Sequence, residues 1–503
     1  MGEDLEKTFF CFLKNHYIMG FHSVFTHMCG IVGIIGGKQV SRLIYHSLFA
    51  IQHRGQSSAG MLVYDGNIHV TKDAGLVREV FDDEKKINVP GNIGIGHTRY
   101  STAGMDDIES LKRNAQPEYL VNPFLAAVHN GNIFNCGDLC KITKRIPRNE
   151  CDIQCLLLPM ADELYKKELS PEVIFDACKN VMNKVKGSYS ALFVADSGDN
   201  PYLFAMTDPY KIRPLVLGKK DGFYCLTSET RVFKKINFQY IKDVPGGSVV
   251  VIDTKGNVFE KQLVKKPMKP CMFEYVYFAK PDSRINGRSV HDVRAELGRL
   301  LAREHPIEAD IVVPVPESGR HYATGYALES GIPLDEGIMK DKDERSFIQQ
   351  TQESRDKVVE EGLSYLRAVL KGKRVVLIDD SIVRGTNIRK LVKGMKDAGA
   401  KEVHVRIGCP PLIAPCYLGI DMRSKKEFIA RDEKGRIKSW EQIAEEIGAD
   451  SLAYTSIENL TKAIGFDTCR GCIEFPDGYP SDWREDVIKL FKKDKKGQRA
   501  YEM

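Results

Sequence analysis

Residues 375–387 read VVLIDDSIVRGTN, and this stretch decides the fold of the second half of the chain. Its first four residues form a continuous apolar run, as expected for a parallel strand buried on both faces. Asp379 and Asp380 then stand at the carboxyl end of that strand, where open α/β sheets bind ligands. The turn at 381–386 predicts a helix start whose backbone N–H groups face a phosphate. A bare acidic pair is usually a solvated loop, but this setting favours a site for a phosphorylated ribose.

The sequence around this stretch alternates helices with strands. Residues 290–301 have helical spacing of apolar residues, ADIVVPVP at 309–316 is strand-like, and the helix after the turn stops at Gly399. Such alternation predicts a parallel sheet. Residues 29–260 instead contain short strand-like runs separated by Gly, Asn and Asp turns, which predicts a sheet-dominated domain. The Lys/Pro stretch KKPMKP at 265–270 has the composition of a linker between the two.

Composition excludes several classes of protein. The chain has 503 residues, 43% hydrophobic and 28% charged, which is typical of a globular enzyme with more than one domain. A net charge of +5 without a basic stripe gives no sign of a nucleic-acid partner. No apolar run approaches the roughly 20 residues of a membrane-spanning helix, and the early FFCFL is too short for a signal peptide. We therefore expect a cytoplasmic protein whose thirteen cysteines stay reduced or bind metal, without disulfides.

Cys29 stands directly before the first strand-like run. A cysteine in such a place is normally a small core residue, but it has four companions along the chain. The set is MCGIVGIIG, IQHRGQSSAG, GHTRYSTAG, HNGNIFN and Asp152. In this order it resembles the amino-terminal-nucleophile glutamine amidotransferases, which implies an αββα sandwich. The resemblance also implies that the thiol attacks the glutamine carboxamide while its own α-amine, with a pKa of about 8, serves as the base.

The resemblance assigns roles to four more residues. Arg99 would clamp the α-carboxylate of glutamine, and Asp152 would pair with its α-ammonium group. Asn130 and Gly131 would stabilise the tetrahedral oxyanion. Taken singly, a surface arginine, a hairpin Asn-Gly and a helix-capping Asp explain them as well, but together they favour the catalytic interpretation. Ser57 departs from the family, whose members usually carry an acid there.

The α-amine mechanism requires Cys29 at the amino terminus of the mature protein, yet 28 residues precede it. Two explanations stay open. Translation starts at Met28, which would be clipped before a small residue, or residues 1–28 are a propeptide lost in maturation. The first is favoured because Met28 directly precedes Cys29 and the leader has no helical or strand period. In either case the uncleaved chain is expected to lack glutaminase activity.

Over about residues 29–480 the chain resembles the glutamine phosphoribosylpyrophosphate amidotransferases, a family of amidophosphoribosyltransferases. The resemblance includes FEYVYFAKPDSRINGRSV at 273–290 and GADSLAYTSIENL at 448–460. It implies that ammonia from glutamine displaces pyrophosphate from phosphoribosylpyrophosphate, which yields phosphoribosylamine and glutamate at the first step of purine synthesis. The family forms homo-oligomers and responds to purine nucleotides. The expected parts are a leader (1–28), a glutaminase domain (29–260), a linker (261–274), a phosphoribosyltransferase domain (275–475) and a charged terminal extension (476–503).

The resemblance also implies the acceptor site. The expected ligands of Mg²⁺ are Ser318, Asp379 and Asp380. The expected phosphoribosylpyrophosphate-binding residues are Asp379, Asp380, Ser381, Arg384, Gly385, Thr386, Lys340 and Arg345. The lid that contains the last two departs from the family: residues 340–345 carry three cations and three anions, and the usual Tyr-Val-Gly centre is missing. Either the lid closes differently with weak turnover, or this loop tolerates change.

Four cysteines match a further family feature. Cys469 and Cys472 form a C-x-x-C pair, and Cys271 and Cys416 fall where iron–sulfur members place their other two ligands. Thiolates suit a [4Fe–4S] cluster, but four of them also suit zinc. Cys409 competes for the third position, so the ligand set and the metal both stay open.

Two other functions are compatible with parts of the chain. A glutamine-dependent sugar-phosphate aminotransferase shares the first-domain motifs, but it carries sugar-isomerase domains in place of the IDDSIVRGT turn. A non-catalytic phosphoribosylpyrophosphate-binding paralogue would keep the fold, and only the unusual lid favours it. The retained Cys29, Ser318 and paired acids favour an enzyme.

Overall fold

The computed structural model describes residues 28–100, 108–143, 145–198, 200–340, 362–422 and 427–494. Within these ranges the chain forms two compact units, each built from separate segments. The first, here called the sandwich unit, takes its described residues from 28–293, 413–427 and 461–494. The second, here called the parallel-sheet unit, takes them from 294–412 and 428–460. The leader before Met28 and the lid residue Arg345 lie outside the described residues.

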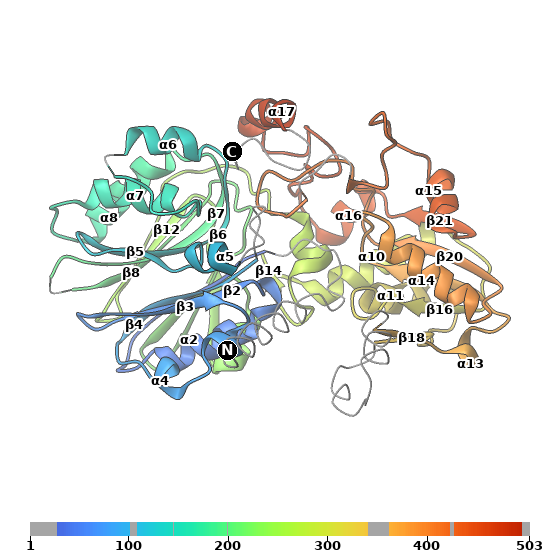
Figure 1. The fold of residues 1–503 in the computed structure, drawn as a ribbon, viewed down its shortest axis with the longest axis horizontal. Coiled ribbons are helices and arrows are strands. Elements are labelled where there is room, and N and C mark those ends of the chain that lie inside the picture. The colour runs from blue at the N-terminus through green and yellow to red at the C-terminus, as the bar shows by residue number, and fades with distance from the viewer. Residues whose placement is uncertain are drawn as a thin grey trace, which may run out of the picture. The chain divides into compact units, whose positions relative to one another are not determined.

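The sandwich unit contains two antiparallel sheets (Figure 1). The first has the order β11-β9-β10-β1-β4-β2-β3, with β1 (Gly30–Ile35), β2 (Ser58–Tyr64), β3 (Ile68–Ala74), β4 (Ile93–Arg99), β9 (Val216–Lys220), β10 (Phe223–Thr227) and β11 (Gln239–Asp243). The second has the order β13-β12-β8-β7-β6-β5, with β5 (Glu118–Leu120), β6 (Phe124–Ile133), β7 (Gly187–Asp196), β8 (Tyr202–Thr207), β12 (Ser248–Asp253) and β13 (Val258–Gln262).

Helices cover the outer face of each sheet. The main ones are α2 (Ser41–Ala50) and α9 (Arg231–Ile236) on the first sheet, and α7 (Gln154–Leu164) and α8 (Pro171–Met182) on the second. Shorter helices are α3 (Val77–Val80), α4 (Glu84–Ile87), α5 (Ile108–Arg113) and α6 (Cys136–Ile142). Alternation along β1 shows the layering, since Ile31 and Ile35 pack between the sheets while Val32 and Ile34 pack under the helices. The αββα architecture expected from the sequence is therefore confirmed.

The parallel-sheet unit contains four strands in the order β16-β19-β20-β21. All three pairings are parallel. The strands are β16 (Ile311–Pro314), β19 (Arg374–Asp379), β20 (Glu402–Ile407) and β21 (Ser451–Tyr454). Its helices are α11 (Arg320–Ser330), α13 (Arg367–Leu370), α14 (Thr386–Asp397) and α15 (Trp440–Ile447), and a hairpin pairs β17 (Ile338–Lys340) with β18 (Leu363–Tyr365). Helices α10 (Val290–Glu304) and α16 (Ile457–Ile464) each have part of their length in this unit and part in the sandwich unit. The expected parallel sheet is thus present.

Helix α14 has the amphipathic pattern that the sequence predicted. Its buried residues Ile388, Leu391, Val392 and Met395 follow helical spacing, and the chain turns away after Asp397. Strand β19 is buried along its apolar run. The VVLIDDSIVRGTN stretch is therefore a strand, a turn and a helix start, in the order expected.

The boundary between the units differs from the one expected at 261–274. Residues 275–293 and 461–475 belong to the sandwich unit. Local contacts within that unit accompany the difference: Lys280 N–H donates to Glu229 Oε2, and Cys469 N–H donates to Pro270 O. The carboxyl-terminal segment also joins this unit: it forms α17 (Arg484–Lys493), and the preceding Trp483 is buried, with its ring 5.0 Å from that of Tyr210.

One cysteine pair contradicts the expectation of reduced thiols. Cys136 and Cys155 form a disulfide, with their Cα atoms 5.4 Å apart. The expectation of reduced cysteines rested on the cellular compartment alone. It missed that α6 and α7 start side by side, which brings a pair separated by 19 residues into contact.

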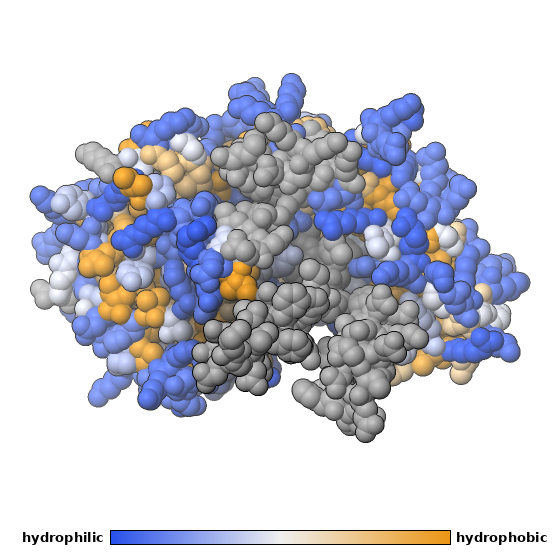
Figure 2. Space-filling view, viewed as in Figure 1, coloured by the Kyte–Doolittle hydropathy of each residue, from blue (hydrophilic) through white to orange (hydrophobic). Residues whose placement is uncertain are grey.

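Figure 2 shows mostly hydrophilic side chains on the face in view, with apolar residues in scattered groups. Among the described residues, no helix is both long enough and apolar enough to cross a membrane.

Candidate active sites

Cys29 lies directly before the first residue of β1 and is partly exposed. Burial of its thiol raises the pKa above the ordinary value, while Arg99, the Tyr100 amide and Arg54 oppose that effect and Asp152 adds to it. The thiol therefore shares one electrostatic neighbourhood with the cation and the anion that the sequence selected. A raised thiol pKa means that the nucleophile needs a base.

Arg99 and Asp152 approach this neighbourhood from different layers. Arg99 ends β4, is 8% exposed, and donates from Nη1 to Asn114 O at 2.6 Å. Asp152 precedes α7, and its side chain is 26% exposed. Burial opposes ionisation of Asp152, but His129, the Ile133 amide and Arg99 outweigh it, so that the pKa lies below the ordinary value. Asp152 is therefore an anion near neutral pH.

A buried hydrogen-bond chain behind Asp152 was not predicted from the sequence. The Gln116 carboxamide accepts from His129 N–H at 2.8 Å, which directs its Nε2 to His129 Nδ1 at 3.1 Å. The Nδ1 atom then accepts, so Nε2 is the ring nitrogen that donates to Asp152 Oδ2, at 3.0 Å. Ile133 N–H donates to the same oxygen at 3.2 Å. These donors hold the carboxylate in place.

The two residues predicted as oxyanion donors, Asn130 and Gly131, lie on β6. The Asn130 side chain is 1% exposed, and its amide nitrogen is a buried donor without a hydrogen-bond partner among the described residues. Such an orphaned donor is costly unless a ligand completes it. At Gly131 a Cβ atom would lie 2.0 Å from Ser188 O, so only glycine fits this approach of β6 to β7. The open Asn130 donor suits a site whose acceptor comes from a substrate, whereas Gly131 is required by the packing of β6 against β7.

Arg54 is a second feature that sequence reasoning missed. Its guanidinium is fully buried and donates from Nε to the Cys29 carbonyl at 3.0 Å. The same group binds Glu274 through two hydrogen bonds of 3.0 and 2.7 Å and Glu229 through one of 2.7 Å. The available signal was Arg54 itself, which lies within the quoted IQHRGQSSAG motif. Arg54 fixes the backbone of the nucleophile rather than the substrate.

The second site lies at the carboxyl ends of two adjacent parallel strands. Ser318 follows β16 and Asp379 ends β19. The Ser318 hydroxyl donates to Asp379 Oδ1 at 2.7 Å, and the Ser381 hydroxyl donates to Asp380 Oδ2 at 2.6 Å. The remaining oxygen of Asp380, Oδ1, is buried without a partner among the described residues. The structure thus brings Ser318, Asp379 and Asp380 together as expected.

The two carboxyl groups are in an environment that disfavours their charge. Burial raises the pKa of both above the ordinary value, and for Asp380 the adjacent Asp379 carboxylate adds to the rise. The guanidinium of Arg294 only partly offsets this for Asp380. A bound cation would relieve the repulsion between the two carboxylates, and the orphaned Asp380 oxygen would coordinate it.

The turn after the acids starts helix α14. Gly385 has a φ of +76°, and a Cβ there would lie 2.2 Å from Ile429 Cδ1. Arg384 and Thr386 are exposed beside it, while Ser381 is buried. Lys340 is exposed at the end of β17, directly before the residues outside the description. The helix start presents backbone N–H groups as an anion site would.

The four predicted cluster cysteines all belong to the sandwich unit. Each is buried, and a β-bridge joins Cys271 to Cys469. Burial raises the pKa of Cys271 to about 12, and Cys416 contributes to the rise. Burial raises the pKa of the Tyr479 hydroxyl, and Cys416, Cys469 and Cys472 all add to this rise. Cys409 lies in the other unit. Even so, the described residues contain no group of three or more His, Cys, Asp or Glu close enough to hold a metal.

Comparison with known proteins gives matching results for both halves. A family model described as "Phosphoribosyl transferase domain" matches residues 288–410. The chain is 41% identical over 472 residues to an amidophosphoribosyltransferase of Methanocaldococcus jannaschii, which covers 89% of this chain and 96% of that protein. The chain belongs to the amidophosphoribosyltransferase family. A Mycobacterium tuberculosis amidophosphoribosyltransferase is 39% identical, covering 90% of this chain and 86% of that protein.

Solved structures of this family have the same fold. The glutamine phosphoribosylpyrophosphate amidotransferase of B. subtilis, complexed with ADP and GMP, matches with a TM-score of 0.77 and 35% identity, covering 90% of this chain and 98% of that chain. A structure titled as the allosteric regulatory enzyme of purine biosynthesis matches with a TM-score of 0.78, also at 35% identity, covering 89% and 96%. Family membership therefore extends over both units.

Proposed function

We propose that this amidophosphoribosyltransferase hydrolyses glutamine in the sandwich unit and transfers the ammonia to phosphoribosylpyrophosphate in the parallel-sheet unit. The products are 5-phosphoribosylamine, pyrophosphate and glutamate. The observation that carries the proposal is the orphaned amide of Asn130, in the domain where a thiol, a guanidinium and a carboxylate share one electrostatic neighbourhood. Most buried donors in proteins have a partner, so a donor left open among these charged groups suits a site that substrate completes.

In the glutaminase site each charged group matches one end of glutamine. Arg99 binds the α-carboxylate, and Asp152, kept anionic by His129, binds the α-ammonium group. The Cys29 thiol attacks the carboxamide carbon, and the α-amine of Cys29, which is free in a mature chain that begins at this residue, takes the thiol proton. Asn130 Nδ2 and the Gly131 amide then stabilise the oxyanion, a contribution of about 3 to 4 kcal/mol per donor in a well-studied protease. The released ammonia is the nitrogen donor.

In the acceptor site the paired acids and the turn bind different parts of phosphoribosylpyrophosphate. Asp379 and Asp380 accept hydrogen bonds from the ribose hydroxyls. The turn formed by residues 381–386 binds the 5-phosphate with backbone N–H groups, including that of Ser381, and with the Thr386 hydroxyl and Arg384. Lys340 and Arg345 contact the pyrophosphate; Arg345 lies outside the described residues.

The residues fit a magnesium ion at this site. Hard oxygen ligands suit Mg²⁺, and the orphaned Asp380 Oδ1 together with the raised carboxyl pKa values supports a cation there. Ser318, Asp379 and Asp380 would hold it. When bound, Mg²⁺ supplies charge neutralisation of the departing pyrophosphate.

We further propose a structural [4Fe–4S] cluster on Cys271, Cys416, Cys469 and Cys472. Their shared unit, burial and mutual electrostatic influence support this set over one that includes Cys409. The side chains must move closer together to bind, since no such group is formed among the described residues. Anaerobic purification followed by iron, sulfide and zinc assays distinguishes a cluster from zinc.

The remaining proposals concern the location, assembly and regulation of the enzyme. We place the enzyme in the cytoplasm, as a homo-oligomer that binds purine nucleotides as feedback inhibitors. The B. subtilis relative was solved with ADP and GMP, and the same nucleotides are the first to test as inhibitors of this enzyme.

The test of function is pyrophosphate release from phosphoribosylpyrophosphate with Mg²⁺, first with ammonia and then with glutamine. The protein should begin at Cys29, confirmed by intact mass. Release with both donors is expected. Tight binding of phosphoribosylpyrophosphate without release from either donor would instead identify a non-catalytic paralogue.

A further inference from the structure

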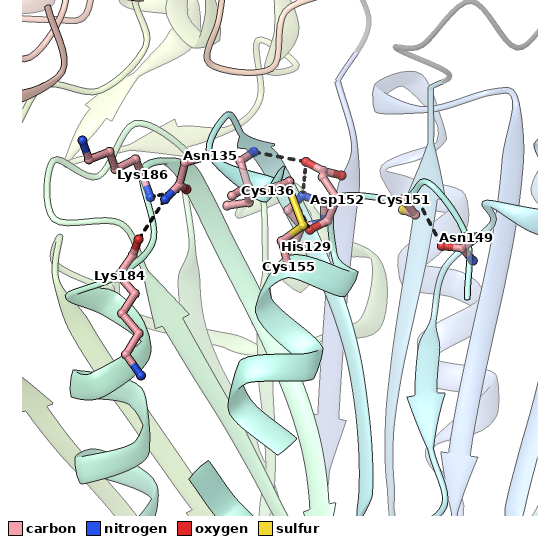
Figure 3. The surroundings of a disulfide bond; sticks show 10 residues. His129, Asn135, Cys136, Asn149, Cys151, Asp152, Cys155, Lys184 and Lys186 are labelled. Atoms are coloured by element: carbon pink, nitrogen blue, oxygen red, sulfur yellow. Dashed lines mark hydrogen bonds and ion pairs between the residues drawn. A yellow bond between two sulfur atoms is a disulfide. The ribbon is translucent and has the colours of Figure 1, made fainter. Parts of the chain in front are cut away.

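The Cys136–Cys155 disulfide lies beside Asp152 (Figure 3). Cys136 begins α6, three residues after the end of β6, and Cys155 lies in the first turn of α7, three residues after Asp152. Cys136 Sγ is 4.0 Å from the Asp152 carbonyl oxygen. The bond therefore ties the segment that carries Asp152 to the end of the strand that carries Asn130.

Asp152 has few other attachments to that strand. Its carboxylate accepts from the His129 ring at 3.0 Å and from Ile133 N–H at 3.2 Å. Both donors belong to β6. The flanking residues Cys151 and Ile153 are buried in the same core cluster as Ile133 of β6. The disulfide adds the one covalent link between the Asp152 segment and the residues that follow β6.

We propose that Cys136 and Cys155 are a reversible modification site whose disulfide positions Asp152 for the α-ammonium group of glutamine. This inference rests on the proposed glutaminase function. Opening the disulfide lets the Asp152 segment move away from β6, which weakens glutamine binding. The parallel-sheet unit contains neither cysteine, so its use of free ammonia does not change.

The chemistry is thiol–disulfide exchange with a dithiol reductant. A reductant thiolate attacks Cys136 Sγ, the sulfur of the partly exposed residue, and breaks the bond so that the electron pair leaves on Cys155 Sγ, which takes up a proton. The second thiol of the reductant then attacks the mixed disulfide and releases Cys136 as a thiol. The reductant becomes a disulfide, and the protein gains two thiols. In a reducing compartment, bonds of this kind usually serve regulation rather than stability.

The experiment uses the enzyme that begins at Cys29, prepared in two states. One state is oxidised and the other is treated with dithiothreitol, and peptide mass under non-reducing conditions reports the 136–155 link. Glutamine KM and kcat are measured for each state by glutamate release, and ammonia-dependent pyrophosphate release is measured in parallel. Cys136→Ser removes the link, and Cys140→Ser is the matched control because Cys140 lies on the same helix without a disulfide.

Reduction is expected to raise glutamine KM about tenfold, the factor that corresponds to about 1.4 kcal/mol, with little change in kcat and none with ammonia. Cys136→Ser should show the raised KM in both states, whereas Cys140→Ser should respond as the wild type does. An unchanged glutamine KM in a protein whose linked peptide disappears on reduction would overturn the inference, and so would absence of the linked peptide after oxidation. Loss of glutamine hydrolysis in both states would instead overturn the proposed function.

Discussion

Replacement of Arg54 by Met tests the buried ionic network that supports the nucleophile. The guanidinium makes three hydrogen bonds to Glu229 and Glu274 and one to the Cys29 carbonyl, all in the interior. Methionine keeps much of the side-chain volume but removes the cation that both carboxylates share, although His53 stays 2.7 Å from Glu229 and Arg213 stays 3.9 Å from Glu274. Breaking a buried pair in this way costs about 3 to 5 kcal/mol, because the carboxylate charge stays buried with less compensation.

The assay is urea unfolding of the enzyme that begins at Cys29, followed by a signal from the sandwich unit. Arg42→Met is the matched control, since Arg42 pairs with Glu84 in the same unit at side-chain exposures of 55% and 71%. Its loss should cost no more than about 1 kcal/mol. Equal unfolding midpoints for the two variants would refute the claim that the Arg54 network stabilises the unit.

The pH dependence of the same comparison follows from Glu229. Burial opposes its ionisation, but His53 and Arg54 outweigh burial and hold its pKa well below the ordinary value. A carboxyl group with a lowered pKa stabilises the fold above its unfolded pKa, about 4.3, and that contribution is lost as the pH falls toward the folded pKa. The stability difference between wild type and Arg54→Met should therefore be full at pH 7 and smaller at pH 4.

Three further variants test the two sites. Asn130→Ala should lower kcat with glutamine by about 10²- to 10³-fold and leave ammonia-dependent pyrophosphate release unchanged; equal loss with both donors would contradict an oxyanion role. Gly131→Ala should abolish glutamine-dependent activity and lower the melting temperature, because its Cβ would lie 2.0 Å from Ser188 O; an unaffected enzyme would show that β6 moves freely. Asp380→Asn should stabilise the metal-free protein at neutral pH while removing Mg²⁺-dependent pyrophosphate release, since burial and Asp379 raise the pKa of that carboxyl; a less stable metal-free variant would contradict the repulsion.

The parts predictable from sequence are those in which chemistry follows local pattern. The apolar run before Asp379 predicted β19, and the small residues after Asp380 predicted the start of α14, because strand burial and helix starts depend on neighbours in sequence. The chain order of the glutaminase motifs likewise predicted the sandwich. In the structure Arg99 and Asp152 both act on the Cys29 thiol.

The parts that sequence reasoning missed depend on contacts between distant residues. Arg54 meets Glu229 and Glu274 across separations of 175 and 220 residues, and no local pattern marks such a pairing. The Cys136–Cys155 bond depends on how two helix starts lie together. The boundary between units escaped prediction for the same reason, since residues after 461 return to the first unit.

The most direct test of the account is Cys29→Ala in the enzyme that begins at residue 29, measured by pyrophosphate release with each nitrogen donor. The account predicts that glutamine no longer supports release, because the nucleophile is gone. Ammonia should still support it at the wild-type rate, because the acceptor site lies in the parallel-sheet unit. Glutamine-dependent release that survives the substitution would contradict the assignment of Cys29 as the nucleophile.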